Sequence, residues 1–195
     1  MKIRKVIANI SNRHCHLTQK HLEVLFGPDA SLTRLRDLIQ PGQYACEEKV
    51  TISTSGGELH NVRIIGPVRS YTQVEISRTD SFLLKIKPEP PVRDSGKLTG
   101  SSPITLIGPA GRIDLKEGCI IAKRHVHFSP SDASLFGVKD GQLVKIRAGG
   151  RTGRTVIFEE VLCRVGENMA LECHLDTDEA NACGLNNGDE VEIIF

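Results

Sequence analysis

Two short motifs place pairs of histidines where one metal ion can bind both. The motifs are Arg13-His14-Cys15-His16 and Arg124-His125-Val126-His127, which share the pattern Arg-His-x-His. In an extended strand, successive side chains point to opposite faces, so the two histidines of each motif lie on the same face, about two residue rises apart. That spacing suits two ligands of one metal ion. Because the pattern occurs twice, the sequence predicts two metal sites.

An internal duplication supplies each histidine pair with a third candidate ligand. Residues 13–27 match residues 124–137, with one extra residue in the first copy. Further along the chain, the same alignment puts Glu75 opposite His174. Two histidines from one strand and a third ligand from a distant strand are typical of catalytic zinc, which keeps one coordination position open for water or substrate. The predicted ligands are His14, His16 and Glu75 at the first site and His125, His127 and His174 at the second.

A single His-x-His pair is weak evidence for a metal site, because strand alternation leaves many such pairs on solvated faces. The recurrence of the pair inside a duplication, each time with a third donor, favours metal binding. Imidazole and carboxylate ligands fit zinc and also accept cobalt or manganese. We therefore predict two zinc ions per chain, with other divalent metals as alternatives.

The cysteines and arginines next to the predicted ligands could take part in the chemistry, but strand geometry favours structural roles for them. Cys15 and Cys173 lie next to predicted ligands, but alternation points them to the opposite face, so we expect small core residues rather than thiolate ligands. Arg13 and Arg124 also face away from the histidine pairs. We expect both arginines to form ion pairs with carboxylates of the short helices.

Arg69 is a candidate for binding an anionic substrate. It lies shortly before Glu75, and its planar guanidinium suits bidentate capture of phosphate or carboxylate, although a solvated loop arginine is an equally good explanation. His21 and His60 have no counterpart in the other copy, and we expect both on the surface. No glycine-rich phosphate loop is present, which argues against ATP and dinucleotides.

Composition and charge exclude several classes of partner. The chain has 195 residues, 39% of them hydrophobic, and a net charge of +1, so no basic face points to nucleic acid or a membrane surface. No stretch approaches the roughly 18 apolar residues of a membrane span, and the apolar run from Val6 to Ile10 is too short for a signal peptide. Six cysteines without Cys-x-x-Cys spacing indicate reduced thiols and a cytoplasmic protein.

The segments around the motifs predict strands and short helices. Thr18 and Ser129 are suited to cap a short helix directly after each His-x-His strand, with Pro130 at the first helical position of the second. Alternating segments such as residues 50–53 and 144–147 predict strands after glycine-containing turns. Many short strands with brief helices favour two small β-barrels or sandwiches over a βαβ arrangement.

We therefore predict a mainly β fold with short capping helices (α+β), in which an internal duplication forms two small β-barrel domains. Residues 87–102 are rich in Pro, Gly and Ser and lack periodicity, as is typical of a linker. The predicted bounds are 1–94 for the first repeat, 95–102 for the linker and 103–195 for the second repeat. A duplicated chain can also exchange strands between its halves, in which case these bounds describe the repeat better than the domains in space.

Seven segments of the chain closely resemble one enzyme family. In order, they are SNRHCHLT, QPGQYA, GPVRSYTQVEISRTD, PVRDSG, ITLIGPAG, AKRHVHFSPSDA and ECHLDTDEANACGL. Together they resemble the PduL-type phosphate acyltransferases, phosphotransacylases associated with propanediol microcompartments. The resemblance covers essentially the whole chain. It implies a reversible reaction of propanoyl-CoA or acetyl-CoA with phosphate, giving acyl phosphate and CoA, on a pair of zinc ions between two β-barrel domains.

The resemblance also implies roles for individual residues. The family's metal ligands fall on the six residues predicted from the repeat. Its phosphate-binding arginine falls on Arg69, and its CoA-contacting positions fall on Ser11, Arg63 and Asn181. Acyl-CoA and inorganic phosphate are the implied partners, and we expect a homo-oligomer. The chain lacks the amphipathic N-terminal extension that many microcompartment members use for encapsulation, so we expect a free cytoplasmic enzyme, with a bacterial microcompartment as the alternative location.

Direct attack of bound phosphate on the thioester is the expected mechanism, and it needs no protein nucleophile. An acyl-enzyme on Cys15 or Cys173 is the competing route, disfavoured by strand geometry. A zinc-dependent hydrolase of thioesters or phosphoesters and a non-catalytic metal-binding scaffold are the other functions that these residues allow. The sequence leaves open the preferred acyl chain, and also which metal binds phosphate and which binds the CoA sulfur.

Overall fold

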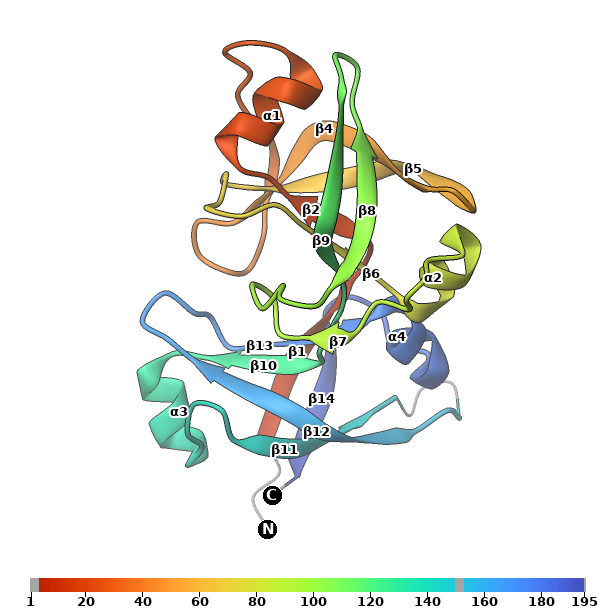
Figure 1. Ribbon diagram of the computed structural model, residues 1–195. Helices are drawn as coiled ribbons and strands as arrows, with labels where there is room; N and C mark the ends of the chain where they lie inside the picture. Colours follow the sequence, from red (N-terminus) through yellow and green to blue (C-terminus); the bar gives the residue numbers. More distant parts are fainter. Residues whose placement is uncertain (1–3, 150–152, 195) are drawn as a thin grey trace. The chain divides into compact units, whose positions relative to one another are not determined.

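The chain forms two compact units in the computed structural model, which describes residues 4–149 and 153–194 (Figure 1). The central unit consists of Asn12–Leu38 and Gly42–Ala122. The C-terminal unit consists of Met1–Ser11, Ile39–Pro41 and Lys123–Phe195. Strands dominate both units, and each unit carries two short helices among the described residues. The predicted fold class, mainly β with short helices, is confirmed.

Six strands of the central unit close into a barrel. Its elements are β2 (His14–His16), α1 (Gln19–Phe26), β3 (Arg34–Asp37), β4 (Tyr44–Thr54), β5 (Gly57–Gly66), β6 (Gln73–Ile76), α2 (Arg78–Leu84), β7 (Val92–Arg93), β8 (Ser102–Ile107) and β9 (Arg112–Ala122). The ring runs β4-β5-β2-β6-β9-β8 and closes where β8 pairs with β4. β3 pairs with β4 and β7 with β9 at the margins of this ring.

Six strands of the C-terminal unit close into a second barrel. Its elements are β1 (Arg4–Ser11), β10 (His125–Phe128), α3 (Pro130–Phe136), β11 (Leu143–Ala148), β12 (Val156–Val165), β13 (Glu172–Asp176), α4 (Thr177–Cys183) and β14 (Asp189–Ile194). The ring runs β11-β12-β10-β13-β1-β14. It repeats the central ring strand for strand, with the same sequence of parallel and antiparallel pairs.

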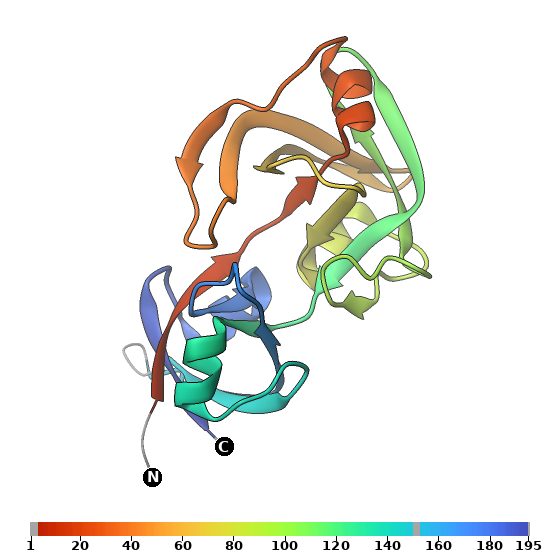
Figure 2. The ribbon, with the colours of Figure 1, turned by 90° about the vertical axis from the view of Figure 1, so that its left-hand side faces the viewer.

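The two repeats exchange their opening strands. β1 precedes β2 in the chain, yet it belongs to the barrel of the C-terminal unit, where it runs parallel to β13 (Figure 2). β9 precedes β10, yet it belongs to the central barrel, where it runs parallel to β6. Each opening strand therefore completes the barrel of the other repeat, which confirms the predicted strand exchange.

Because of this exchange, the compact units do not have the same bounds as the sequence repeats. The central unit continues to Ala122, beyond the predicted boundary at residues 95–102, and β1 joins the C-terminal unit. Residues 95–102 lie inside the central unit, mostly between β7 and β8. The division into 1–94 and 103–195 stays a prediction about the duplication, not a description of the compact units.

The helices after the His-x-His strands begin and end as the sequence predicts. The Thr18 hydroxyl accepts a hydrogen bond from the His21 amide at the start of α1, and the Ser129 hydroxyl accepts one from the Asp132 amide at the start of α3. Pro130 occupies the first turn of α3. Side-chain caps of this kind satisfy amides that lack a partner within the helix, so each motif strand leads into a fixed helix. None of the helices in the described ranges has the length and apolar character needed to span a membrane.

Strand alternation separates a core face from a polar face in both barrels. Cys15 and Val74 are fully buried in the central core, and Val126 and Cys173 are fully buried in the C-terminal core. The histidines on either side of Cys15 and of Val126 consequently face away from these cores. The two polar faces hold the candidate metal ligands.

Candidate metal centres and family

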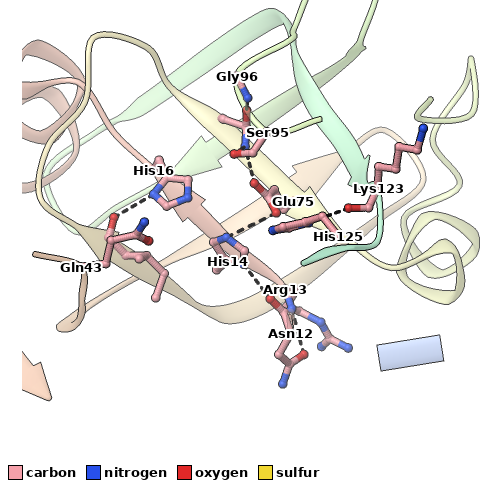
Figure 3. Close-up of polar contacts among 12 residues, drawn as sticks. Asn12, Arg13, His14, His16, Gln43, Glu75, Ser95, Gly96, Lys123 and His125 are labelled. Carbon is pink, nitrogen blue, oxygen red and sulfur yellow. Dashed lines mark hydrogen bonds and ion pairs between the residues drawn. The ribbon is translucent and has the colours of Figure 1, made fainter. Parts of the chain in front are cut away.

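The His-His-Glu cluster of the central unit consists of His14, His16 and Glu75, and it forms across the antiparallel pair β2–β6. His14 lies directly opposite Glu75 in the register, and its Nε2 is 3.6 Å from Glu75 Oε2 (Figure 3). One ligand atom from each of the three residues lies within 4.8 Å of the others. His16 and Glu75 are buried, and His14 is partly exposed. The prediction from the repeat thus brings together three side chains that can share a metal ion.

The tris-histidine cluster of the C-terminal unit consists of His125, His127 and His174, and it forms across the equivalent pair β10–β13. His125 lies opposite His174 in the register. The Nε2 atoms of His125 and His127 are 2.9 Å apart, and all three ligand atoms lie within 4.8 Å of one another. Two nitrogens bound to one tetrahedral zinc ion, each at about 2.0–2.1 Å, would be about 3.3 Å apart. The donor set therefore fits a metal ion of this size.

Backbone carbonyls fix the tautomers of three of these histidines. The Nδ1 atom of His14 lies 2.8 Å from the Asn12 carbonyl, and that of His125 lies 2.8 Å from the Lys123 carbonyl (Figure 3). The Nδ1 atom of His16 lies 3.0 Å from the Ile65 carbonyl. A carbonyl only accepts, so the proton sits on Nδ1 and the Nε2 lone pair is free to bind a metal.

Burial keeps the His16 and His127 imidazoles neutral. It lowers the pKa of His16 well below its usual value, and the nearby His14 and Arg69 lower it further. Burial likewise lowers the pKa of His127 to about 3, with contributions from His174 and Arg164. Metal ligation requires the unprotonated ring, so His16 of the central cluster and His127 of the C-terminal cluster are ready to bind metal at neutral pH. The buried Nδ1 of His127 has no hydrogen-bond partner among the described residues.

An arginine lies beside each cluster. Arg69 follows β5, and its guanidinium donates to the Tyr71 hydroxyl at 3.1 Å and to the Gln43 side-chain oxygen at 3.4 Å. Arg164 on β12 lies directly opposite His127 in the parallel register, so its side chain is on the histidine face. Arg69 was anticipated, whereas Arg164 was not, because β12 carries no recognisable motif.

The arginines that precede the histidine pairs form the expected ion pairs. Arg13 Nε donates to Asp80 Oδ2 at 3.1 Å, and its Nη2 lies 2.6 Å from Oδ1. Arg124 Nη1 donates to Glu179 Oε1 at 2.7 Å. Asp80 and Glu179 occupy the same position, the third residue of the helix that follows the third-ligand strand. Each pair therefore links a His-x-His strand to the element that continues from its third ligand.

The cysteines beside the ligands are core residues, as predicted. Cys15 and Cys173 have no exposed surface, and burial raises the pKa of both thiols far above the usual range. The thiolate is the reactive form of cysteine. Neither side chain is therefore available as a nucleophile at neutral pH.

Comparison with known proteins assigns the family. A family model described as phosphate propanoyltransferase matches residues 7–186. The chain is 53% identical to a phosphate propanoyltransferase of Thermotoga maritima, over 97% of this chain and 89% of the relative. It is 50% identical to one of Shewanella putrefaciens, over 98% of this chain and 89% of the relative, and 48% identical to one of Lachnoclostridium phytofermentans, over 97% and 87%.

The chain belongs to the phosphate propanoyltransferase family. It is therefore an acyltransferase, as its sequence motifs predict. All six candidate metal ligands and Arg69 fall inside the part of the chain that matches the family model.

The positions expected to contact CoA in this family lie in both units. Ser11 ends β1 opposite Asp176, the residue that caps α4, and Asn181 is exposed on α4 itself. Arg63 lies on β5 opposite His14 and donates to the carbonyl of Cys46. The CoA-binding roles of Ser11, Arg63 and Asn181 stay predictions.

His21 and His60 differ from each other. His60 is exposed, as expected, whereas His21 is only partly exposed and its Nδ1 lies 2.7 Å from the Thr72 hydroxyl. His21 thus contacts the loop that leads into β6, a role that its lack of a repeat partner did not reveal.

Two buried polar residues beside the clusters were missed. Gln73 lies opposite His16 on β6, and Glu172 lies opposite His127 on β13. Burial disfavours ionisation of Glu172, but its contacts with His174, Gln40 and Asn9 outweigh this and lower its pKa to about 2. The signal was present in the sequence, since the alignment of Glu75 with His174 also aligns the residues two positions earlier, on the same strand face.

Proposed function

We propose that the chain transfers an acyl group, propanoyl or acetyl, between CoA and phosphate, and that each histidine cluster holds one divalent metal ion, with zinc the first candidate. The family supports the acyl transfer. The observation that carries the metal requirement is the pair of largely buried clusters, whose ligand atoms converge within 4.8 Å while backbone carbonyls contact His14 and His125 at Nδ1. Such preorganisation is characteristic of metal ligands.

In the proposed reaction, a phosphate oxygen attacks the thioester carbonyl carbon, a carbon–oxygen bond forms, and the carbon–sulfur bond breaks. The electron pair of that bond leaves with sulfur, and the CoA thiolate then takes up a proton. A bound divalent metal supplies Lewis acidity, which reduces the charge repulsion of phosphate and stabilises oxyanion or thiolate.

Arg69 is the proposed phosphate-binding residue. Tyr71 and Gln43 hold two nitrogens of its guanidinium, which limits the orientations of the fork. The guanidinium also lies close enough to His16 to lower the pKa of that ring. A held arginine beside a metal cluster can fix phosphate in the orientation that attack requires.

No protein nucleophile is needed, and the burial of Cys15 and Cys173 supports this. An acyl-enzyme on either thiol would require a substrate carbonyl to enter a core that has no exposed surface. Replacement of Cys15 by Ala is therefore expected to leave turnover intact, provided that metal content is unchanged.

The deciding experiment is thiol release from acetyl-, propanoyl- and butanoyl-CoA by protein of counted metal content, with and without phosphate. We expect release that depends strictly on phosphate, appearance of acyl phosphate, and loss of turnover after chelation that added zinc restores. Release without phosphate would instead indicate a thioester hydrolase. Unchanged acyl-CoA with metal-loaded protein would indicate a non-catalytic scaffold, and full activity after chelation would exclude the metal requirement.

We also propose a cytoplasmic location. The six cysteines are all buried and free, as expected for a protein that folds in a reducing compartment. Thiol counting on protein taken directly from cells tests this, with six free thiols per unfolded chain as the expected result.

A further inference from the structure

The two third-ligand strands carry their carboxylates in different registers. β6 has Gln73 opposite His16 and Glu75 opposite His14, whereas β13 has Glu172 opposite His127 and His174 opposite His125. The sequence Gln-x-Glu in one barrel thus becomes Glu-x-His in the other. Each polar face contains one buried carboxylate on this strand, displaced by two residues between the barrels.

Glu172 is held tightly beside the tris-histidine cluster. Its side chain is 5% exposed, and Oε2 lies 3.0 Å from the Nε2 atom of His174. Asn9 donates to Oε1 at 2.6 Å, and Gln40 donates to Oε2 at 2.5 Å. Gln40 is itself fixed, since it donates to the Ala170 carbonyl and accepts from the Ala170 amide. Two amides therefore orient a carboxylate toward a candidate metal ligand.

Gln73 occupies the position of Glu172 in the central unit, but it is a neutral amide that contacts a carboxylate. It is fully buried, and its amide nitrogen donates to Glu75 Oε1 at 2.5 Å and to the Ser95 hydroxyl at 2.9 Å. Its oxygen accepts from the Gly96 amide at 2.7 Å. Here a neutral amide donates to the candidate ligand carboxylate, while in the C-terminal unit a carboxylate lies 3.0 Å from a ring nitrogen of the candidate ligand His174.

The charge of a bound ion explains why β13 needs the carboxylate of Glu172. Three neutral imidazoles contribute no negative charge, so a divalent ion among them would keep its full charge in a largely buried site. Burial of an uncompensated charge is costly, and buried ions are normally paired. In the central unit, Glu75 provides the compensating charge within the ligand set itself.

Building on the proposed function, we propose that Glu172 is the positioning carboxylate of the C-terminal metal centre, which orients His174 and supplies the negative charge that Glu75 supplies in the central unit. Carboxylates that contact a ligand histidine typically change metal affinity by about 10- to 100-fold when removed. Asn9 and Gln40 hold Glu172 in place and belong to the same arrangement.

The test is zinc titration of the metal-free whole chain against a competing chromophoric chelator, comparing wild type with Glu172→Gln. We expect two binding events in wild type and a roughly 10- to 100-fold weaker second event in the variant. The double variant Glu172→Gln, His174→Glu recreates the Gln-x-Glu register of β6, and we expect it to regain most of the lost affinity. The visible spectrum of bound Co²⁺ should change in both variants, because the contacts or the identity of a ligand change.

Two controls separate metal binding from folding and assign the weakened event. Glu179→Gln removes a partly buried carboxylate of the same unit that pairs with Arg124 and has no hydrogen bond or ion pair to a cluster histidine among the described residues, so it should lower the unfolding temperature of metal-free protein without weakening zinc. Glu75→Ala removes a central ligand and identifies which event belongs to which cluster. Wild-type affinity at both sites in Glu172→Gln would overturn the role of Glu172 alone. Fewer than two zinc ions in wild type would instead overturn the proposed metal requirement.

Discussion

The His-His-Glu cluster and the tris-histidine cluster occupy equivalent positions in two barrels of the same topology, yet their ligand sets differ in charge. Both use a His-x-His strand paired with an antiparallel third-ligand strand in the same register. In both, the first histidine contacts the carbonyl two residues before it. The backbone thus fixes where the ligands lie, and single side-chain replacements on β6 and β13 change what they are.

The comparison shows how a duplication can give two unlike centres without a change of fold. The His-His-Glu set carries one negative charge, and the tris-histidine set carries none. An ion bound by neutral ligands retains more of its charge and is the stronger Lewis acid, while a carboxylate ligand weakens that character. Under the proposed function, the two clusters differ in whether the compensating carboxylate binds the metal directly, as Glu75 would, or acts through His174, as Glu172 would. The following variants test whether both clusters are needed.

Removal of one ligand from each cluster should have the largest effect. His16→Ala and His127→Ala each delete a buried ligand, and we expect each to lose one metal ion per chain and to lower kcat by about 10³-fold or more, since a metal contributes several kcal/mol to catalysis. Metal analysis and phosphate-dependent thiol release measure the two effects. His60→Ala is the control, because His60 is 66% exposed at its side chain and belongs to neither cluster. If one variant kept its turnover after losing a metal, that cluster would be structural and the other alone catalytic.

The arginines beside the clusters should differ in their effect on phosphate. Arg69 is held by Tyr71 and Gln43, whereas no hydrogen bond from the Arg164 side chain is found in the described part of the chain. Charge-assisted hydrogen bonds contribute about 1.5–3 kcal/mol, so Arg69→Ala should raise the KM for phosphate by about 10- to 100-fold. We expect a smaller rise for Arg164→Ala. The matched variant Arg69→Lys keeps the positive charge but loses the planar guanidinium. Its KM for phosphate should therefore lie between those of wild type and Arg69→Ala.

Steady-state kinetics at saturating acyl-CoA, with phosphate varied, separate these effects. A larger rise in the phosphate KM for Arg164→Ala than for Arg69→Ala would assign phosphate to the tris-histidine cluster and reverse the proposed role of Arg69.

Local features of both clusters could be predicted from the sequence, whereas long-range pairings could not. Alternation and the repeat predicted the candidate ligand triads, the helix caps and an ion-pairing role for Arg13 and Arg124, because these follow from neighbouring residues or from one alignment. The partners Asp80 and Glu179 lie 67 and 55 residues away from the arginines and were not predicted. The sequence did not determine which barrel each opening strand joins, because β1 and β9 carry similar strand patterns and either would complete a barrel. The contact of Gln40 with Glu172 could not be predicted either, because the two residues lie 132 positions apart in the chain.

The ion pairs behind the clusters should differ in their contribution to stability. The Asp80 side chain is 2% exposed and that of Glu179 is 18% exposed, so loss of the arginine leaves a more deeply buried charge in the central unit. We expect Arg13→Ala to lower the free energy of unfolding by roughly 3 kcal/mol and Arg124→Ala to lower it by about 1 kcal/mol. Chemical denaturation of metal-free protein measures both values.

The control for these ion pairs is Arg112→Ala, which breaks an exposed pair with Asp114 and should leave the unfolding midpoint unchanged. Equal losses for Arg13→Ala and Arg124→Ala would show that the two linkages are energetically equivalent despite their different burial.

The smallest expected difference is in the response of metal-free protein to acid. Burial lowers the pKa of His125 and His127 in the C-terminal cluster and of His16 in the central one. Each ring then binds a proton more readily in the unfolded chain, where its pKa is about 6.5. The neutral histidines therefore stabilise the fold fully above pH 6.5, and this contribution declines as the pH falls toward the folded value, which is about 3 for His127. Linkage limits the slope to about 1.4 kcal/mol per pH unit for each histidine.

The C-terminal cluster has two histidines with a lowered pKa and the central cluster has one. Replacing these histidines should therefore change the pH dependence of stability more in the C-terminal cluster than in the central one. Unfolding free energies of metal-free protein, measured from pH 7 to pH 5, should depend less on pH in the double variant His125→Gln, His127→Gln than in His16→Gln, because two acid-sensitive groups are lost rather than one. The slope is the quantity to compare, since each replacement also changes packing and shifts all values together. Equal slopes in the two variants would show that the clusters resist protonation alike, and that their difference lies in the third ligand and its carboxylate alone.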